Sequence, residues 1–254
     1  MLVSVLASGS KGNCCFVQTE NLKILIDAGM SLRYIKEKLQ EVNSSPEEID
    51  YILITHTHSD HVKGIKSFIK KHSPKIVLSE KMLEDLDYLN DYGNLIINKK
   101  ELVLENVKID YIKTSHDTSD SRAYIIEEKD SSMVYITDTG YINQKYFNKL
   151  KNKNLYVFEA NHDIEMLMEG PYPAWLKTRI LSDVGHLSNA SSAFYLSKLI
   201  GENTKKVILA HLSEENNDEK LVLSTIKEKF LEYDIPFDGF LIAQQKCKTE
   251  AIII

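Results

Sequence analysis

The sequence has few of the features that mark export, membrane insertion or disulfide bonding. Only three of its 254 residues are cysteines, and two of these, Cys14 and Cys15, are adjacent, which excludes a disulfide framework. No apolar run approaches the ~18 residues that cross a bilayer, and no basic segment precedes the short apolar start. We therefore expect a protein of the reducing cytoplasm with no membrane partner.

Linkers, low-complexity tracts and short repeats are also missing, so we expect one domain spanning residues 1–254. Strand-like runs occur at Met1–Leu6, Cys14–Gln18, Lys23–Ile26, Ile49–Thr55, Lys75–Leu78, Leu155–Glu159, Lys206–Ala210, Phe240–Ala243 and Glu250–Ile254, with more strands between Asn94 and Thr137. Helical spacing predicts helices at Ser31–Val42, Val62–His72, Glu80–Leu89, Gln144–Lys151, Ser188–Gly201 and Asp218–Glu232. This order suggests an α/β or α+β fold with two packed sheets covered by helices. Trp175 suits either the core or an interface, so the oligomeric state stays open.

An excess of basic residues is absent as well, because the net charge is −6. Affinity for phosphate backbones comes largely from Lys and Arg, so this balance is unusual for a nucleic-acid enzyme. Acids in a metal site would soften the objection, since divalent cations reverse the local charge. One basic cluster is present, formed by Lys63, Lys66, Lys70, Lys71, His72 and Lys75. We interpret it as a solvated helix face, with a polyanion-binding surface as the alternative.

The most informative segment is Thr55–Gly64, which reads THTHSDHVKG. Directly after a strand-like run, it places His56, His58, Asp60 and His61 within six residues. Neutral imidazole and carboxylate are ligands for zinc, manganese and iron. Because His56 and His58 are two residues apart in an extended segment, they point the same way and can share one ion. Asp60 and His61 turn away into a helix start and can serve a second ion.

The pattern His-x-His-x-Asp-His-x-x-Gly resembles the signature of the metallo-β-lactamase superfamily. The resemblance implies an α/β fold of the αββα sandwich type, with two packed mixed β-sheets flanked by helices. It also implies that residues at three strand ends complete a site for two divalent ions: His116 for the first ion, His211 for the second, and Asp138 between them. Asp27 resembles a supporting carboxylate of the family. Zn²⁺ or Mn²⁺ is expected, with iron as a further alternative.

Three more segments are similar to the WalJ (YycJ)-type nuclease subgroup: Ala7–Asn13, Phe158–Asp163 and Leu181–Asn189. This similarity implies a metal-dependent phosphodiester hydrolase with a nucleic acid substrate, most closely a 5′-to-3′ exonuclease on double-stranded DNA. The attacking group would be a hydroxide bridging two ions ~3.5–4 Å apart. The alternatives are an RNA-processing nuclease, a glyoxalase-type thioester or ester hydrolase, and a metal-binding regulatory protein whose site is catalytically silent.

Beyond the other ligands, five residues are candidates for catalysis or substrate binding. Asp60 belongs to the catalytic group. His186 lies where related tRNA-processing enzymes carry a catalytic histidine, and it would stabilise phosphoryl charge or protonate the leaving oxygen. His162 is a second candidate for that work, or for holding a terminal phosphate. Asn13 and Lys11, in the loop after the first strand, are candidate substrate contacts.

Overall fold

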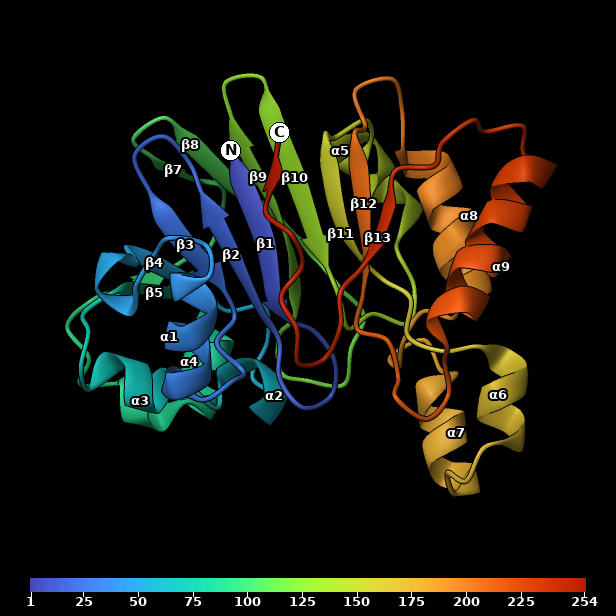
Figure 1. Ribbon diagram of the computed structural model, residues 1–254. Helices are drawn as coiled ribbons and strands as arrows, with labels where there is room; N and C mark the ends of the chain where they lie inside the picture. The colour runs from blue at the N-terminus through green and yellow to red at the C-terminus, as the bar shows by residue number, and fades with distance from the viewer.

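The computed structural model describes residues 1–254 and contains two seven-stranded mixed sheets packed face to face (Figure 1). The first sheet contains, in spatial order, β14 (Ile252–Ile253), β1 (Leu2–Ala7), β2 (Cys14–Gln18), β3 (Lys23–Ile26), β4 (Tyr51–Leu53), β5 (Lys75–Leu78) and β6 (Leu95–Ile97). The second contains β13 (Phe240–Ile242), β12 (Lys206–Ala210), β11 (Leu155–Glu159), β10 (Ser131–Ile136), β9 (Arg122–Glu128), β8 (Val107–Lys113) and β7 (Leu102–Leu104). In each sheet an antiparallel half continues into a parallel half, β3 to β6 in the first and β10 to β13 in the second.

Helices cover the outer face of each sheet, which confirms the expected αββα architecture. The first sheet is covered by α1 (Leu32–Gln40), α3 (Ile65–Ile69) and α4 (Glu80–Asp85), and the second by α5 (Phe147–Leu150), α8 (Asn189–Leu199) and α9 (Glu219–Glu232). At the lower end of the view in Figure 1 lie α2 (Ser59–Val62), α6 (Ile164–Glu169) and α7 (Ala174–Ile180). Both chain termini lie at the opposite end. No helix is long and apolar enough to cross a membrane.

Side chains alternate between the two faces of a strand, so the first sheet contributes to two apolar cores. In β2, Cys15 and Val17 face the second sheet and join the apolar cluster between the sheets. Cys14 and Phe16, from alternate positions, face outward and pack with the residues of α1, α3 and α4. Because successive side chains on a strand point to opposite faces, a fully apolar strand is what a sheet covered on both sides requires.

Two parts of the chain differ from the expectation. The helix expected over Val62–His72 is divided into α2 and α3 at Gly64, whose N–H donates to the Ala28 carbonyl at 2.8 Å. A Cβ at Gly64 would lie 2.2 Å from the Met30 carbonyl oxygen, so the chain must be glycine at this close approach. The sequence also did not predict α6 and α7, because each is short and buries a single residue, Leu167 or Ile180. That leaves no apolar periodicity to detect.

Candidate metal centre

Three residues of the candidate site follow strand ends and adopt an uncommon backbone conformation. Asp27 follows β3, Asp138 lies two residues after β10, and His211 follows β12, with φ of 60°, 57° and 58°. Residues other than glycine rarely adopt this left-handed conformation, and its cost tends to be tolerated at functional sites. Strand ends from both sheets thereby deliver carboxylate and imidazole groups to one end of the sandwich.

Backbone contacts hold the loops of this end together. The Asn13 N–H donates to the Asp60 carbonyl at 2.7 Å, and the Ala28 N–H donates to the His61 carbonyl at 2.9 Å. Gly29 approaches Asp60 so closely that a Cβ would lie 1.6 Å from the Asp60 carbonyl oxygen. This glycine therefore lets the loop after β3 pack against the histidine motif.

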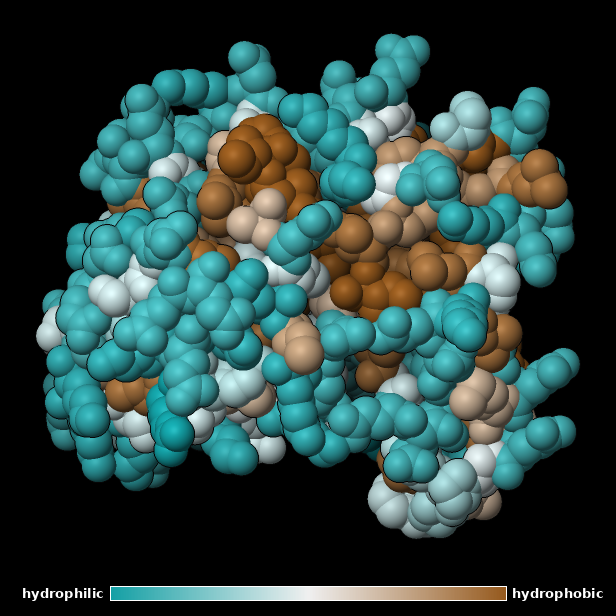
Figure 2. Space-filling view, viewed as in Figure 1, coloured by the Kyte–Doolittle hydropathy of each residue, from teal (hydrophilic) through white to brown (hydrophobic).

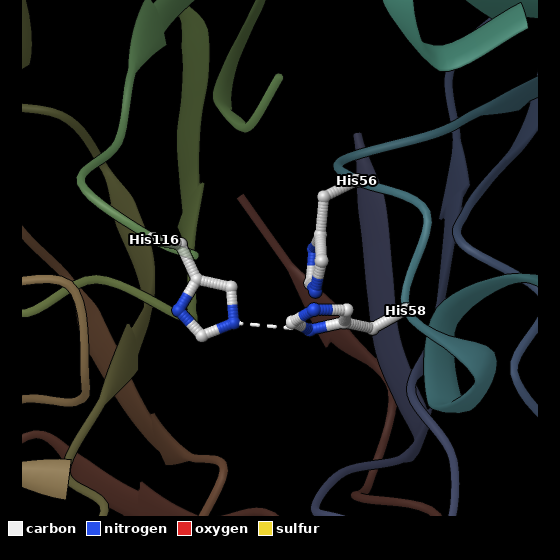
Figure 3. Close-up of side chains that lie close together, drawn as sticks. All are labelled: His56, His58 and His116. Carbon is white, nitrogen blue, oxygen red and sulfur yellow. Dashed lines mark hydrogen bonds between the residues drawn. The ribbon is translucent and has the colours of Figure 1, made fainter. Parts of the chain in front are cut away.

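The first ligand cluster consists of His56, His58 and His116. Figure 3 shows His56 and His58 entering from one loop and His116 from the opposite side, with the three rings converging. One ligand atom from each lies within 4.8 Å of the others, and His116 Nε2 is 3.2 Å from His58 Nδ1. This spacing of three imidazole nitrogens could hold one metal ion.

A second cluster lies directly beside the first. It consists of Asp60, His61 and His211, whose ligand atoms again lie within 4.8 Å of one another. The Asp138 carboxylate lies between the two clusters, with Oδ2 3.2 Å from His61 Nε2 and Oδ1 3.4 Å from His211 Nε2. Its Oδ1 is also 3.9 Å from Nε2 of His116 in the first cluster. The seven residues expected from the sequence are thus brought together, with Asp138 in the expected central place.

The ring nitrogens that face away from the clusters also have polar neighbours. Asp27 Oδ2 is 2.7 Å from His61 Nδ1, and Asp27 is itself held by the N–H and hydroxyl of Thr55, each at 2.8 Å. His116 Nδ1 lies 3.1 Å from the Val184 carbonyl oxygen. Such partners orient the imidazoles and select which nitrogen faces the site. Asp27 therefore takes the supporting position that its motif suggested.

Glu159 is a site residue that the sequence reasoning missed. It ends β11, is fully buried, and places Oε1 3.3 Å from His211 Nδ1 and 2.7 Å from His186 Nδ1. Its Oε2 accepts from the Thr139 N–H at 3.0 Å. Burial alone would raise the pKa of Glu159, but His186 and His211 more than offset this and lower it to about 2. The available signal was an acidic residue at a strand end, the same signal that identified Asp138.

Burial and charge match this site to cations. Burial lowers the pKa of His56 and His116, which keeps both imidazoles neutral, as metal ligands must be. Among the candidate ligands, three buried atoms have no hydrogen-bond partner: Nε2 of His56, Oδ2 of Asp138 and Nε2 of His211. Buried polar atoms are normally satisfied, and the residues that carry these three belong to the two ligand clusters or lie between them. Divalent cations would satisfy them, so this donor set fits divalent metal ions.

The second cluster holds protons that a cation would displace. Burial would lower the pKa of His61, yet the carboxylates of Asp27 and Asp138 raise it well above its ordinary value. In His211 burial is likewise outweighed, chiefly by Asp138, and its pKa rises to about 10. Both rings carry a proton that must leave when a metal ion binds.

His186 lies next to both clusters. Its Nδ1 is bonded to Glu159 and lies 3.8 Å from Asp138 Oδ1, while its ring stacks on His211 with centroids 5.2 Å apart. The side chain is 12% exposed. A histidine whose Nδ1 is held by a carboxylate keeps Nε2 for proton transfer. These contacts place the His186 ring beside Asp138 and His211, with Nδ1 held by Glu159.

His162 lies outside the ligand clusters, and the catalytic role expected for it stays a prediction. The residue is 1% exposed, and neither ring nitrogen has a hydrogen-bond partner. Burial lowers its pKa to about 4, so the ring is neutral near pH 7 and a poor proton donor.

The two candidate substrate contacts also lie in different settings. Asn13 is fully buried, and its amide nitrogen lies 3.2 Å from Asp60 Oδ2 and 2.9 Å from His61 Nε2. The substrate-binding role expected for Asn13 therefore finds no exposed surface, and its contacts position the ligands instead. Lys11 is exposed and pairs with Glu214.

Half of the basic cluster after the histidine motif lies away from this end of the molecule. Lys71, His72 and Lys75 line a cavity of about 610 Å³ near the starts of β3, β4 and β5, whereas the site residues follow the ends of these strands. Lys63, which follows α2 directly, is exposed, as are Lys66 and Lys70. The solvated-face interpretation is therefore favoured for Lys71, His72 and Lys75.

Comparisons with known proteins agree with this geometry. A family model described as a beta-lactamase superfamily domain matches residues 23–212. Exodeoxyribonuclease WalJ of Streptococcus pneumoniae is 37% identical over 239 residues, which cover 91% of this chain and 89% of that protein. Exodeoxyribonuclease YycJ of Bacillus anthracis is 34% identical, covering 89% and 87%. The crystal structure of the metallo-β-lactamase fold protein YhfI from Bacillus subtilis aligns with a TM-score of 0.74, 17% identity and 98% coverage of each chain.

Proposed function

This chain belongs to the beta-lactamase superfamily, and from that premise we propose that it is a metal-dependent exodeoxyribonuclease. The observation that carries the proposal is the similarity to two exodeoxyribonucleases across about nine tenths of the chain. A complete set of candidate metal ligands supports the same conclusion. We extend it to 5′-to-3′ degradation of double-stranded DNA, the mode that the resemblance of the sequence implies.

The proposed metals are two divalent ions, Zn²⁺ or Mn²⁺. The first ion would be held by His56, His58 and His116, and the second by Asp60, His61 and His211, with Asp138 between them. When bound, such ions acidify a water molecule and neutralise the charge that grows on the phosphoryl oxygens. Asn13 and Asp27 would keep the ligand side chains in place through the contacts described above.

The remaining chemistry falls to side chains beside the ions. His186 would donate a proton from Nε2 to the leaving oxygen, and the Glu159 carboxylate would hold its ring in place. Lys11, which is exposed and has only the Glu214 carboxylate as its partner, would exchange that partner for a substrate phosphate. We further propose the cytoplasm as the compartment, because all three cysteines are free.

The test is a degradation assay with the purified protein and Mn²⁺ or Zn²⁺. Double-stranded DNA, single-stranded DNA and RNA, each labelled at one end, are compared with the wild type, Asp60→Ala and Asp238→Ala. Asp238 is a matched control because its side chain is 80% exposed and pairs only with Lys227. We expect the wild type and Asp238→Ala to shorten DNA from its 5′ end, and Asp60→Ala to be inactive because a ligand of the second ion is lost.

The metal content of all three proteins is measured in parallel. Full activity of Asp60→Ala would contradict a two-metal mechanism. An absence of cleavage of every nucleic acid by the metal-loaded wild type would overturn the nuclease assignment. In that case a thioester or ester substrate is assayed with the same proteins.

A further inference from the structure

The segment containing α6 and α7 projects from the sandwich beside the candidate metal centre (Figure 1). The chain that leads from α7 back to the sheet passes next to the candidate ligand His116. The Val184 and Gly185 carbonyl oxygens lie 3.1 and 3.3 Å from His116 Nδ1. A second tie comes from α7 itself. Arg179 makes two hydrogen bonds to the Asp117 carboxylate, at 2.5 and 2.8 Å. The projecting segment is therefore attached to the first ligand cluster at two points.

Asp117 places this attachment within reach of the site. Its Oδ1 lies 3.7 Å from His116 Nε2 and 3.9 Å from His58 Nε2, the nitrogens of two candidate ligands. The last turn of α7 therefore stands at the rim of the metal centre.

Trp175 lies one helical turn from Arg179. Residues four apart on a helix lie on the same face, displaced by about 6 Å along the axis. Trp175 is the only tryptophan in the chain, and it is 70% exposed. This excludes the core position that its residue type suggested. Tryptophan is usually well buried, and such an exposed ring near a reaction centre indicates a contact with a partner or a substrate.

Other exposed apolar residues accompany this ring. Leu181 and Val184 lie in the segment that follows α7 and approaches His116, and they are 44% and 41% exposed. Met168 on α6 is 56% exposed. Figure 2 shows pale and brown atoms among the hydrophilic ones on this projecting part. The surface that leads from the metal ligands toward Trp175 is therefore unusually apolar for the rim of a hydrolytic site.

The charges of α7 indicate what would cover this surface. The helix carries Lys177 and Arg179 and no acidic residue; Arg179 is paired with Asp117, and Lys177 donates to the Met168 carbonyl oxygen at 2.6 Å. An exposed aromatic ring beside the Lys177 ammonium group suits a ligand with flat rings and a negatively charged backbone, as in single-stranded nucleic acid.

We propose that Trp175 stacks on a nucleobase of the substrate strand near the phosphodiester at the metal ions. The inference rests on the proposed nuclease function and deepens it, because it assigns a base contact to a residue outside the ligand set. Stacking is tolerant of sequence, since every base has a π-face. The contact would hold the strand end in register for successive cleavages.

The kinetic test compares Trp175→Ala, Trp175→Phe and Leu231→Ala with the wild type on single-stranded and double-stranded DNA. Leu231 on α9 is a matched control because it is apolar and 82% exposed. For Trp175→Ala we expect KM to rise by about five- to 150-fold, the value of one lost base stack, with kcat little changed. Trp175→Phe retains an aromatic face and should stay close to the wild type, as should Leu231→Ala.

A substrate change provides the complementary arm. DNA whose two nucleotides at either end are abasic should raise the KM of the wild type as the Trp175→Ala substitution does. The same abasic ends should add little to the KM of Trp175→Ala, because ring and base form one contact. Hydrolysis of bis(p-nitrophenyl) phosphate, which has no nucleobase, should be equal in the wild type and Trp175→Ala.

Fluorescence separates a failure of this inference from a failure of the proposed function. Because Trp175 is the only tryptophan, its emission reports directly on stacking. Quenching by base-bearing but not by abasic oligonucleotide would support the contact even if the wild type cleaved no nucleic acid. An active wild type with no quenching and an unchanged KM in Trp175→Ala would overturn it. An equal loss of activity of Trp175→Ala on bis(p-nitrophenyl) phosphate would also overturn it. So would a dimeric wild type that becomes monomeric in Trp175→Ala, because the surface would then belong to a second copy of the chain.

Discussion

At the scale of single residues, buried carboxylates of the candidate site hold the rings of neighbouring histidines. His61 is held by Asp27, His211 by Glu159, and His186 by the same Glu159 carboxylate. A buried carboxylate on the far nitrogen fixes the ring orientation. Glu159 thus couples the candidate proton donor to a candidate ligand of the second ion.

This coupling leads to a prediction for His186. Replacement by Ala should lower kcat by about 10²- to 10⁴-fold, because the proton donor to the leaving oxygen is lost, while both metal ions stay bound. The measurements are turnover on end-labelled DNA and metal content by mass spectrometry. His72→Ala is the control, since His72 lines the cavity at the opposite strand ends.

The geometry of His186 is also compatible with a role as a metal ligand. One atom of His186 lies within 4.8 Å of atoms from Asp138, Glu159 and His211, which is also ligand spacing. If His186→Ala loses a metal ion together with activity, His186 is a ligand and its role as proton donor is wrong.

At the scale of elements, strand ends carry the chemistry and ion pairs along the strands hold neighbouring elements in register. Glu127 on β9 accepts from Lys153, which precedes β11, at 2.5 Å, and lies 3.6 Å from Lys108 on β8. Burial alone would raise the pKa of Glu127, but the two lysines more than offset it and lower the pKa. This one carboxylate therefore connects three parts of the second sheet.

The stability of this connection should depend on pH. Because the pKa of Glu127 is lower in the folded protein than its unfolded value of about 4.3, its contribution is present above pH ~4.3. It is lost as the pH falls through the lower folded value. Glu127→Gln should reduce the free energy of unfolding at pH 7 by at most about 1 kcal/mol, since the group is partly exposed.

Urea denaturation at pH 7 and in the acid range tests this prediction. The difference between the wild type and Glu127→Gln should shrink as the pH falls. Glu84→Gln, at an exposed position on α4, is the control. A difference that grows in acid would mean that the lysines do not stabilise the Glu127 carboxylate.

At the scale of the whole molecule, the two sheets share one apolar cluster and present their strand ends on the same side. Ile126 on β9 is fully buried in this cluster, together with Val5, Leu53 and Val157 from other strands of both sheets. The candidate site needs this packing, because His116, Asp138 and His211 come from the second sheet and His56, His58 and His61 from the first.

We therefore predict that the sheets unfold together, as one domain over residues 1–254. Ile126→Ala should lower the free energy of unfolding by about 2–5 kcal/mol through the cavity it leaves. Circular dichroism and calorimetry should follow one common transition. Ile253→Ala, at a position 78% exposed, should change stability by less than about 0.5 kcal/mol. Two separated transitions would contradict the single-domain prediction.

The sequence alone determined most of the elements and the family. Alternating or continuous apolar runs indicated strands such as Cys14–Gln18 and Lys206–Ala210, which the structure has at the same bounds. Period and side-chain type are local properties, so they can be read without a fold. The four residues His56, His58, Asp60 and His61 are close in the chain, and their chemistry was therefore visible as a motif.

Only the tertiary structure decided how distant residues meet and which side chains are left to act. His58 and His116 are 58 positions apart and touch only because the ends of strands from two sheets align. The same alignment buried His162, a candidate for catalysis, and Asn13, a candidate substrate contact, and brought Glu159 between His186 and His211. It also left Trp175 exposed at the rim. Burial and partners are set by packing between elements, and no local pattern of residue types contains that information.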